Sequence, residues 1–167
     1  MRTIGVSKLV YILFYNSLDR FYIRKPGPNG IYYHRRWGFD QDKIRVEFFY
    51  KYNGEIWRIV GKPDQVRFEN GSMVIAELKT IRRETSRDIM GMIGYAQVNI
   101  YAYGLAKNFV PIIEVYVFNI EKDKEPQLWI RRKADLQYAE SLIKKALDRI
   151  LREEKERESL LKSIKLF

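Results

Sequence analysis

Asp64, Glu77 and Lys79 are the residues of this sequence whose types and spacing could do chemistry. Glu77 and Lys79 are two residues apart in an apolar stretch, so in a β-strand their side chains leave the same face. A turn is predicted at Glu69–Ser72, and Asp64 and Glu77 are equally far from it, so antiparallel pairing should bring them together. Two carboxylates beside an ammonium could hold a divalent cation and orient a water or neutralise a phosphate. The alternative is an ordinary ion pair at a strand end.

Gln97 and Tyr101 form a second candidate group. They are four residues apart in a segment, 85–106, whose spacing predicts a helix, and residues four apart lie on one helical face. This face should pack beside the end of the strand that carries Glu77 and Lys79. The alternative is a polar edge of a core helix next to an ordinary buried tyrosine.

The elements that must position these groups can be predicted from periodicity and turn signals. Residues 43–68 predict two strands joined at Asn53-Gly54, the second ended or interrupted at Asp64, and residues 73–79 predict a third antiparallel strand. Ser7 is expected to cap a first helix, residues 24–30 to form a loop, and residues 112–120 and 127–133 to form two more strands. With a last helix from about Ala134, the order is αβββαββα, a mixed α/β (α+β) fold with a central mixed sheet flanked by helices.

The chain is expected to fold as one domain over residues 1–167. Its end, 152–167, is predicted to be a charged helical extension. This extension is either solvated, or its apolar residues Leu160, Leu161 and Ile164 dock on the domain or on a second subunit.

Composition narrows the partners and the chemistry. Lys and Arg number 31 against 21 Asp and Glu, a net charge of +10, which favours a polyanion such as nucleic acid or an anionic membrane surface. The longest apolar run near the N-terminus, residues 9–15, is too short to span a bilayer, so we expect no membrane partner and a cytoplasmic protein. The absence of cysteine and the single histidine exclude thiolate and multi-histidine sites, so a metal would bind mainly to carboxylate oxygens, as Mg²⁺ or Mn²⁺ does.

Basic and aromatic residues could contact nucleic acid near the predicted site. We expect them to grip phosphates or stack on bases, although a solvated charged surface is the alternative for each. They are Arg35, Arg36, Trp37, Arg82, Arg83 and Arg87.

The ordered motifs of the chain resemble the PD-(D/E)XK nuclease superfamily. "GKPD" (61–64), "ELK" (77–79) and "QVNIY" (97–101) are similar to the G-x-x-D, ExK and Q-x-x-x-Y pattern of its RecB-like branch, which includes CRISPR-associated exonucleases. Residues 6–25 are similar to the helix that opens those nucleases, and His34 lies where the family places a histidine upstream of the aspartate. Many CRISPR-associated members hold an iron–sulfur cluster with four cysteines. This chain has no cysteine, so we expect no cluster.

The resemblance implies a restriction-endonuclease-like core that hydrolyses DNA phosphodiester bonds with a metal-activated water. Asp64 and Glu77 would bind Mg²⁺ or Mn²⁺ with the carbonyl of Leu78, and Lys79 would position the water or stabilise negative charge. Gln97 and Tyr101 would support Lys79 or the DNA backbone.

The resemblance also makes His34 a candidate metal ligand. The alternative for His34 is an ordinary loop histidine that contacts a carboxylate or a backbone carbonyl.

The substrate would be single- or double-stranded DNA. Two other functions stay open: a non-catalytic nucleic-acid-binding protein that retains the fold, and a homo-oligomer or a subunit of a repair or adaptation complex.

Overall fold

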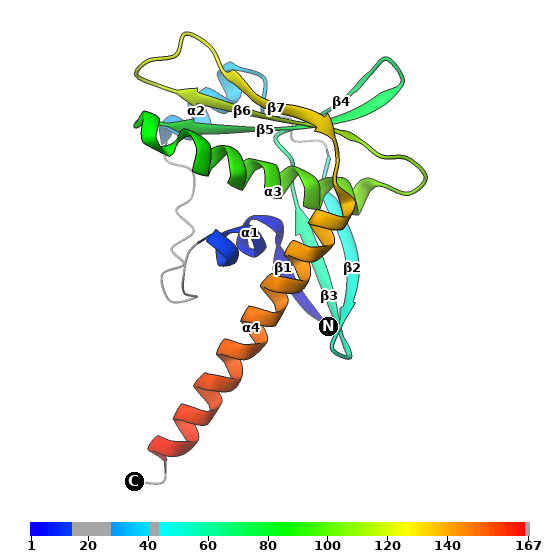
Figure 1. Cartoon of the computed structure of the whole chain (residues 1–167), viewed down its shortest axis with the longest axis vertical. Coiled ribbons are helices and arrows are strands. Elements are labelled where there is room, and N and C mark those ends of the chain that lie inside the picture. The colour runs from blue at the N-terminus through cyan, green and yellow to red at the C-terminus, as the bar shows by residue number, and fades with distance from the viewer. Residues whose placement is uncertain (15–27, 41–43, 166–167) are drawn as a thin grey trace.

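The strands of the protein form two β-sheets, and β5 (Ser72–Ile81) of the second sheet carries Glu77 and Lys79 (Figure 1). The structure is a computed structural model that describes residues 1–14, 28–40 and 44–165. The elements in chain order are β1 (Arg2–Gly5), α1 (Val6–Phe14), α2 (Pro28–Arg36), β2 (Val46–Tyr52), β3 (Glu55–Gly61), β4 (Gln65–Glu69), β5 (Ser72–Ile81), the short 3₁₀ turn η2 (Glu84–Ser86), α3 (Arg87–Leu105), β6 (Ile112–Asn119), β7 (Gln127–Lys133) and α4 (Leu136–Ile164).

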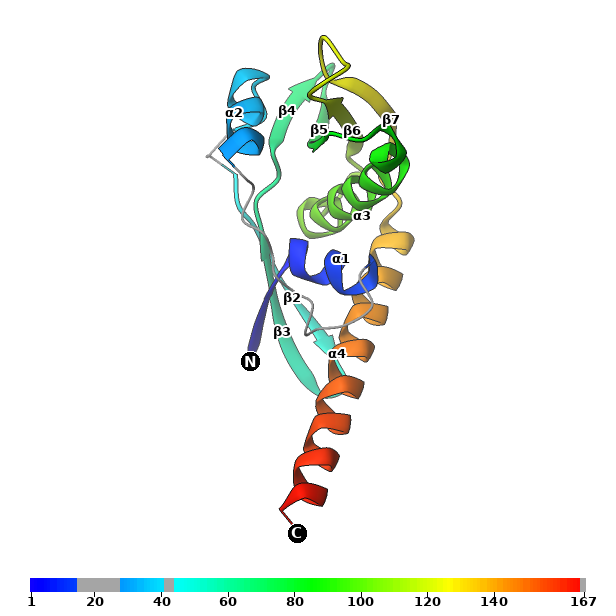
Figure 2. The same ribbon diagram turned by 90° about the vertical axis from the view of Figure 1, so that its left-hand side faces the viewer.

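One sheet has the strand order β1-β3-β2 and the other β4-β5-β6-β7. The second sheet is mixed, because β5 and β6 run parallel while β4 and β7 pair antiparallel with their neighbours. Helix α3 covers one of its faces and α2 lies on the opposite side, at the end of β5 (Figure 2). The predicted mixed α/β fold with helices flanking a mixed sheet is therefore confirmed.

Both predicted hairpin turns are present. Asn53 and Gly54 have φ values of 48° and 78°, and Asn70 and Gly71 have values of 50° and 79°. Two consecutive residues with positive φ are the signature of a type I′ turn, which suits a two-residue hairpin loop. In the second hairpin Gln65 pairs with Ala76, so the next position outward on each strand brings Asp64 to Glu77.

The predicted second strand is in fact two strands in two sheets. β3 ends at Gly61, β4 begins at Gln65, and Asp64 lies at the bend between them. Pro63 has no backbone N–H and cannot continue a ladder of hydrogen bonds, which explains the break. The interruption expected at Asp64 thus marks the point where the chain passes from one sheet to the other.

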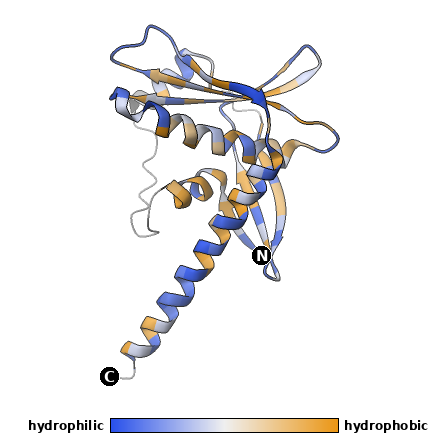
Figure 3. Ribbon diagram, in the orientation of Figure 1, coloured by the Kyte–Doolittle hydropathy of each residue, from blue (hydrophilic) through white to orange (hydrophobic). Residues whose placement is uncertain are grey.

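The helices pack around α3. α1 contacts both α3 and α4, and buries Val6, Leu9, Val10 and Ile12. α4 is capped by the side chain of Asp135, which accepts a hydrogen bond from the backbone of Tyr138. Its apolar stripe is buried up to Ile150, whereas residues 155–164 continue as an exposed, mainly hydrophilic helix (Figure 3).

Three local predictions were wrong or incomplete. β1 and α2 were not expected, and α2 occupies the end of the predicted loop at 24–30. α1 begins at Val6, so Ser7 lies inside the helix instead of capping it. The rest of that loop, and most of the segment similar to the opening helix of the family, lies outside the described residues.

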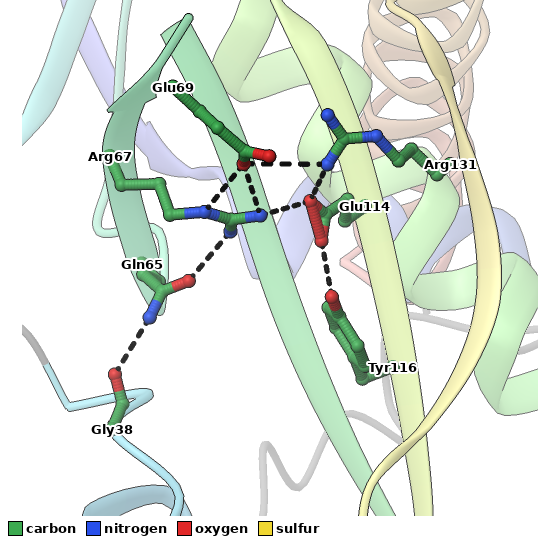
Figure 4. A network of polar contacts seen from close by, with 7 residues as sticks. All are labelled: Gly38, Gln65, Arg67, Glu69, Glu114, Tyr116 and Arg131. Carbon is green, nitrogen blue, oxygen red and sulfur yellow. Dashed lines mark hydrogen bonds and ion pairs between the residues drawn. The ribbon is translucent and has the colours of Figure 1, made fainter.

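A polar network fixes β4 relative to its neighbours on the face of the sheet opposite α3 (Figure 4). Its centre is the carboxylate of Glu114, which is 1% exposed and bound by two guanidinium groups and a tyrosine hydroxyl. Gln65, next to Asp64, donates to the backbone carbonyl of Gly38 at 3.2 Å. The network therefore joins β4, β6, β7 and the residues that follow α2, and comprises Gly38, Gln65, Arg67, Glu69, Glu114, Tyr116 and Arg131.

Candidate active site

Asp64 and the edge of β5 form the centre of the candidate site. β4 pairs with β5 only up to Ala76, so beyond that residue this edge of β5 faces the bend that carries Asp64. The backbone N–H of Leu78 donates to Asp64 Oδ2 at 2.8 Å, and the N–H of Asp64 donates to Glu77 Oε2 at 3.4 Å. The convergence predicted from the turn is present.

Glu77 and Lys79 form an ion pair along one face of the same strand segment. Lys79 Nζ donates to Glu77 Oε1 at 2.9 Å, and the two side chains are only 11% and 6% exposed, respectively. Burial and the charge of Asp64 raise the pKa of the Glu77 carboxyl. Burial alone would lower the pKa of Lys79, but the charges of Glu77 and Asp64 outweigh it and raise that pKa. Asp64 and Glu77 therefore favour positive charge in this pocket in addition to the Lys79 ammonium.

His34 reaches the same point from α2. Its Nε2 lies 3.1 Å from Asp64 Oδ2 and 3.0 Å from the carbonyl oxygen of Leu78, and its Nδ1 lies 2.7 Å from the carbonyl of Gly30. Burial lowers the pKa of His34, but hydrogen bonding to Asp64 and the charge of that carboxylate outweigh burial and raise it to about 9. The imidazole is thus protonated at neutral pH, so both ring nitrogens act as hydrogen-bond donors: Nδ1 to the Gly30 carbonyl, and Nε2 to Asp64 and the Leu78 carbonyl.

The donor atoms around His34 fit a hard divalent cation. The His34 nitrogen lies about 3 Å from both the carboxylate oxygen and the carbonyl oxygen, close to the spacing of adjacent ligands in an octahedron with bonds of about 2.1 Å. Over residues 1–14, 28–40 and 44–165, no three His, Cys, Asp or Glu side chains group closely enough to hold an ion by themselves. The Leu78 carbonyl would have to act as the third protein ligand, because Glu77 is turned toward Lys79. This donor set suits Mg²⁺ or Mn²⁺.

Gln97 and Tyr101 are held inside the protein, each 2% exposed. The Gln97 amide nitrogen donates to the hydroxyl of Ser7 at 3.1 Å. Burial and the charges of Glu77 and Asp64 raise the pKa of the Tyr101 hydroxyl well above the usual value, and this hydroxyl contacts the backbone of Lys62. These contacts link α3 to α1 and to the segment that carries Asp64.

Ser7 is the residue of this site that the sequence analysis missed. No local pattern pairs position 7 with position 97, because their contact depends on how α1 packs on α3. Only the presence of a small polar residue among the apolar residues of α1 could have indicated it.

A pocket of about 420 Å³ joins these groups. Its lining comprises Ser7, Tyr11, Ile31, His34, Phe39, Asp40, Lys62, Pro63, Asp64, Glu77, Leu78, Lys79, Thr80, Met90, Gln97 and Tyr101.

The six predicted nucleic-acid contacts lie outside this lining, and several have partners within the protein. Arg35 pairs with Asp40, Arg36 lies over the ring of Trp37, and Trp37 itself packs against Phe118. Arg82 lies 3.7 Å from Glu121, whereas Arg87 is bound by Glu84 and Asp123 and donates to the carbonyl of Val117. Arg83 is exposed.

No helix among the described ranges is both long and apolar enough to cross a membrane.

Comparison with known proteins agrees with this fold. A solved crystal structure of a protein designated SSO0001 matches with a TM-score of 0.58 at 19% sequence identity, covering 90% of this chain and 76% of that one. No curated protein sequence matches the chain. The family model of the PD-(D/E)XK nuclease superfamily matches residues 28–162, a range that includes Asp64, Glu77 and Lys79 as well as His34. The chain belongs to the PD-(D/E)XK nuclease superfamily.

Proposed function

We propose that this protein is a metal-dependent deoxyribonuclease of the RecB-like branch. One observation carries the proposal. The His34 imidazole lies about 3 Å from both the Asp64 carboxylate and the Leu78 carbonyl, beside a buried Glu77–Lys79 pair. A protein that only binds nucleic acid has no need to set two carboxylates where phosphates would approach, because like charges repel.

The reaction proposed is hydrolysis of a phosphodiester. The water oxygen forms a bond to phosphorus, the bond to one ester oxygen breaks, and a proton passes to that leaving oxygen, which gives a phosphate monoester and a free hydroxyl. Bound Mg²⁺ or Mn²⁺ supplies Lewis acidity and lowers the pKa of water. Asp64, His34 and the Leu78 carbonyl would hold the ion, with Glu77 turning to it once a cation compensates its charge.

Lys79 would act on the phosphate itself. Its Nζ is held by Glu77 at the pocket, so its position is fixed before substrate binds. A fixed ammonium stabilises the negative charge that grows on the non-bridging oxygens, at no cost in reorganisation.

The RecB-like assignment is supported by a contact between its motifs. A Cβ at Gly61 would lie 2.6 Å from Tyr101 Cε1, too close for any side chain. The glycine of "GKPD" and the tyrosine of "QVNIY" thus pack directly on each other, and the Tyr101 hydroxyl is hydrogen bonded to Lys62 in the same segment. The residues of the G-x-x-D and Q-x-x-x-Y motifs therefore pack together and support the segment that carries Asp64.

The test is cleavage of end-labelled single- and double-stranded DNA with Mg²⁺, with Mn²⁺ and with EDTA, and RNA of the same sequence as the comparison. We expect metal-dependent cleavage of DNA that EDTA abolishes. DNA binding without cleavage under every condition would instead support a non-catalytic protein that retains the nuclease fold.

A further inference from the structure

Gln65 joins the strand that begins beside Asp64 to the helix that carries His34. It is the first residue of β4 and directly follows Asp64 in the chain. Its amide nitrogen donates to the backbone carbonyl of Gly38 at 3.2 Å, just beyond the end of α2 (Figure 4). This hydrogen bond therefore connects the two elements from which Asp64 and His34 approach each other.

The direction of the Gln65 amide is fixed by Arg67. A guanidinium nitrogen of Arg67 donates to Gln65 Oε1 at 2.8 Å. Because a guanidinium has donors and no acceptor, the amide atom that it binds must be the oxygen, which leaves the nitrogen to face Gly38. Arg67 is itself bound by the carboxylate of Glu114, which is 1% exposed. The contact with Gly38 therefore starts from a buried anchor in the sheet.

Gly38 is connected to His34 through the turn that ends α2. Gly38 has a φ of 74°, and its N–H donates to the carbonyl of Arg35 at 3.2 Å. The N–H of Phe39 donates to the carbonyl of His34 at 2.8 Å. A left-handed glycine with these two hydrogen bonds is the Schellman motif, which ends many helices. His34 thus belongs to the turn that Gln65 contacts, and a displacement of Gly38 would move it.

Aromatic packing also holds α2 against the sheet. Three pairs of rings make this contact, with centroids 5.0, 5.9 and 5.4 Å apart, in the order Tyr33–Phe118, Trp37–Phe118 and Phe39–Tyr116. Apolar packing is not directional, so it keeps α2 on the sheet but restrains its rotation less strictly than a hydrogen bond does. A metal ligand needs a defined position, because a small divalent cation such as Mg²⁺ demands near-ideal geometry. The Gln65 contact supplies a directional restraint close to His34.

We propose that Gln65 is a positioning residue for the metal site, which holds the last turn of α2 so that the His34 imidazole can bind the same ion as Asp64. This rests on the proposed function, because it assumes the metal site described there. The Gln65 amide is committed to Gly38 and Arg67, so Gln65 acts by fixing His34 relative to Asp64 and not by touching the ion.

A double-mutant cycle, read out by calorimetric Mn²⁺ titration without DNA, tests this role. Gln65→Met keeps the length of the side chain and removes the amide. The Kd for Mn²⁺ should therefore rise about three- to tenfold, the size of one net hydrogen bond. In a His34→Ala background the same change should alter the Kd by less than about twofold, because the histidine that Gln65 positions is gone.

Tyr116→Phe is the matched control within the same network. It removes the hydroxyl that donates to Glu114 but keeps the ring that packs on Phe39, and Glu114 retains two guanidinium partners. Its Kd for Mn²⁺ should stay within about twofold of wild type. Circular dichroism in EDTA shows that each variant is folded. If Gln65→Met does not fold, Gln65→Asn, which keeps the amide on a shorter side chain, replaces it in the cycle.

Three results would overturn the inference. They are an unchanged Kd in the Gln65 variant, an equal loss with and without His34, and a loss in Tyr116→Phe as large as that in the Gln65 variant. An equal loss with and without His34 would mean that Gln65 acts through its neighbour Asp64.

The titrations also separate this inference from the nuclease function. Wild-type protein that binds no Mn²⁺ would reject the metal site and the role of Gln65 together. Wild-type protein that binds Mn²⁺ but cleaves no DNA would reject the nuclease function, while the cycle still decides the role of Gln65.

Discussion

At the scale of single residues, the imidazole of His34 is hydrogen bonded to two of the groups that are proposed to bind the metal ion. Its Nε2 lies between Asp64 Oδ2 and the Leu78 carbonyl, and both are proposed ligands. The protonated imidazole satisfies these acceptors in the metal-free protein much as an ion would. The charged groups that face it are Asp64 and Glu77, whose negative charges both favour its protonated form.

Metal binding should therefore compete with a proton. The pKa of His34 is raised to about 9, so below that pH an incoming Mn²⁺ must displace a proton, and its apparent affinity should rise as pH increases from 7 to 9. His34→Ala should weaken Mn²⁺ binding and flatten this dependence, because no imidazole proton is left to displace. Calorimetric Mn²⁺ titrations at several pH values measure both effects. The same pH slope in wild type and His34→Ala would mean that His34 is not a ligand.

At the scale of elements, the sequence could predict what local signals determine. The two Asn-Gly turns and Pro63 determine where the strands reverse and break, and they sufficed to bring Asp64 to Glu77. β1 could not be predicted, because its four residues are a strand only through parallel pairing with the distant β3.

Helix α2 and the contact made by Ser7 could not be predicted from the sequence for the same reason. "PNGIYYHRR" has no apolar stripe of helical period, so nothing local indicates that it presents His34 to Asp64. Ser7 meets Gln97 only through the packing of α1 on α3. Contacts between elements far apart in the chain decide these features.

Close packing of α3 on the sheet should be visible in matched glycine variants. A Cβ at Gly94 would lie 2.7 Å from Val115 Cγ1, which must give way, and in ordinary contact at 3.5 Å from Lys79 Cγ. Gly94→Ala should therefore move α3 relative to the strands beneath it, next to the stem of Lys79. We expect both a lower Tm and a kcat reduced about tenfold or more, since small displacements at the reacting centre are costly.

Gly91→Ala is the control for this effect. Its Cβ would lie 2.3 Å from Cε2 of Trp129, a residue outside the pocket lining, so it should lower Tm while largely keeping kcat in the folded protein. Thermal denaturation and steady-state kinetics on both variants separate the two effects. Equal kcat losses would show that Lys79 is not sensitive to the packing at Gly94.

At the scale of the whole molecule, a pocket that contains the Asp64 and Glu77 carboxylates lies in a basic protein. The chain carries a net charge of +10, although Asp64 and Glu77 would repel a polyanion at the pocket itself. Under the proposed function, basic residues elsewhere would attract DNA, while a bound cation would make the final approach of a phosphate favourable. Arg36 and Arg83 are exposed and lie outside the pocket lining.

DNA affinity should consequently fall steeply with salt. Each phosphate contact should contribute about −0.7 to −0.9 to the slope of log K against log salt, because contacts release counterions. Arg36→Gln with Arg83→Gln should reduce the steepness of the slope by about 1 to 2, whereas Arg152→Gln on the exposed side of α4 should leave it nearly unchanged. Fluorescence anisotropy over a salt series measures these slopes. A flat response in wild type would exclude a phosphate-tracking surface.

The central claim, that the groups around Asp64 form a phosphodiesterase site, is tested most directly by Lys79→Met. This change keeps the stem that packs near Gly94 and removes only the ammonium that Glu77 holds at 2.9 Å. Cleavage rate under single-turnover conditions and DNA affinity in EDTA should be measured on the same preparation. The account predicts a loss of cleavage of at least about 100-fold, of the size found for other preorganised transition-state donors, with DNA affinity changed less than about threefold. Cleavage within a few-fold of wild type, or wild-type cleavage that persists in EDTA, would contradict it.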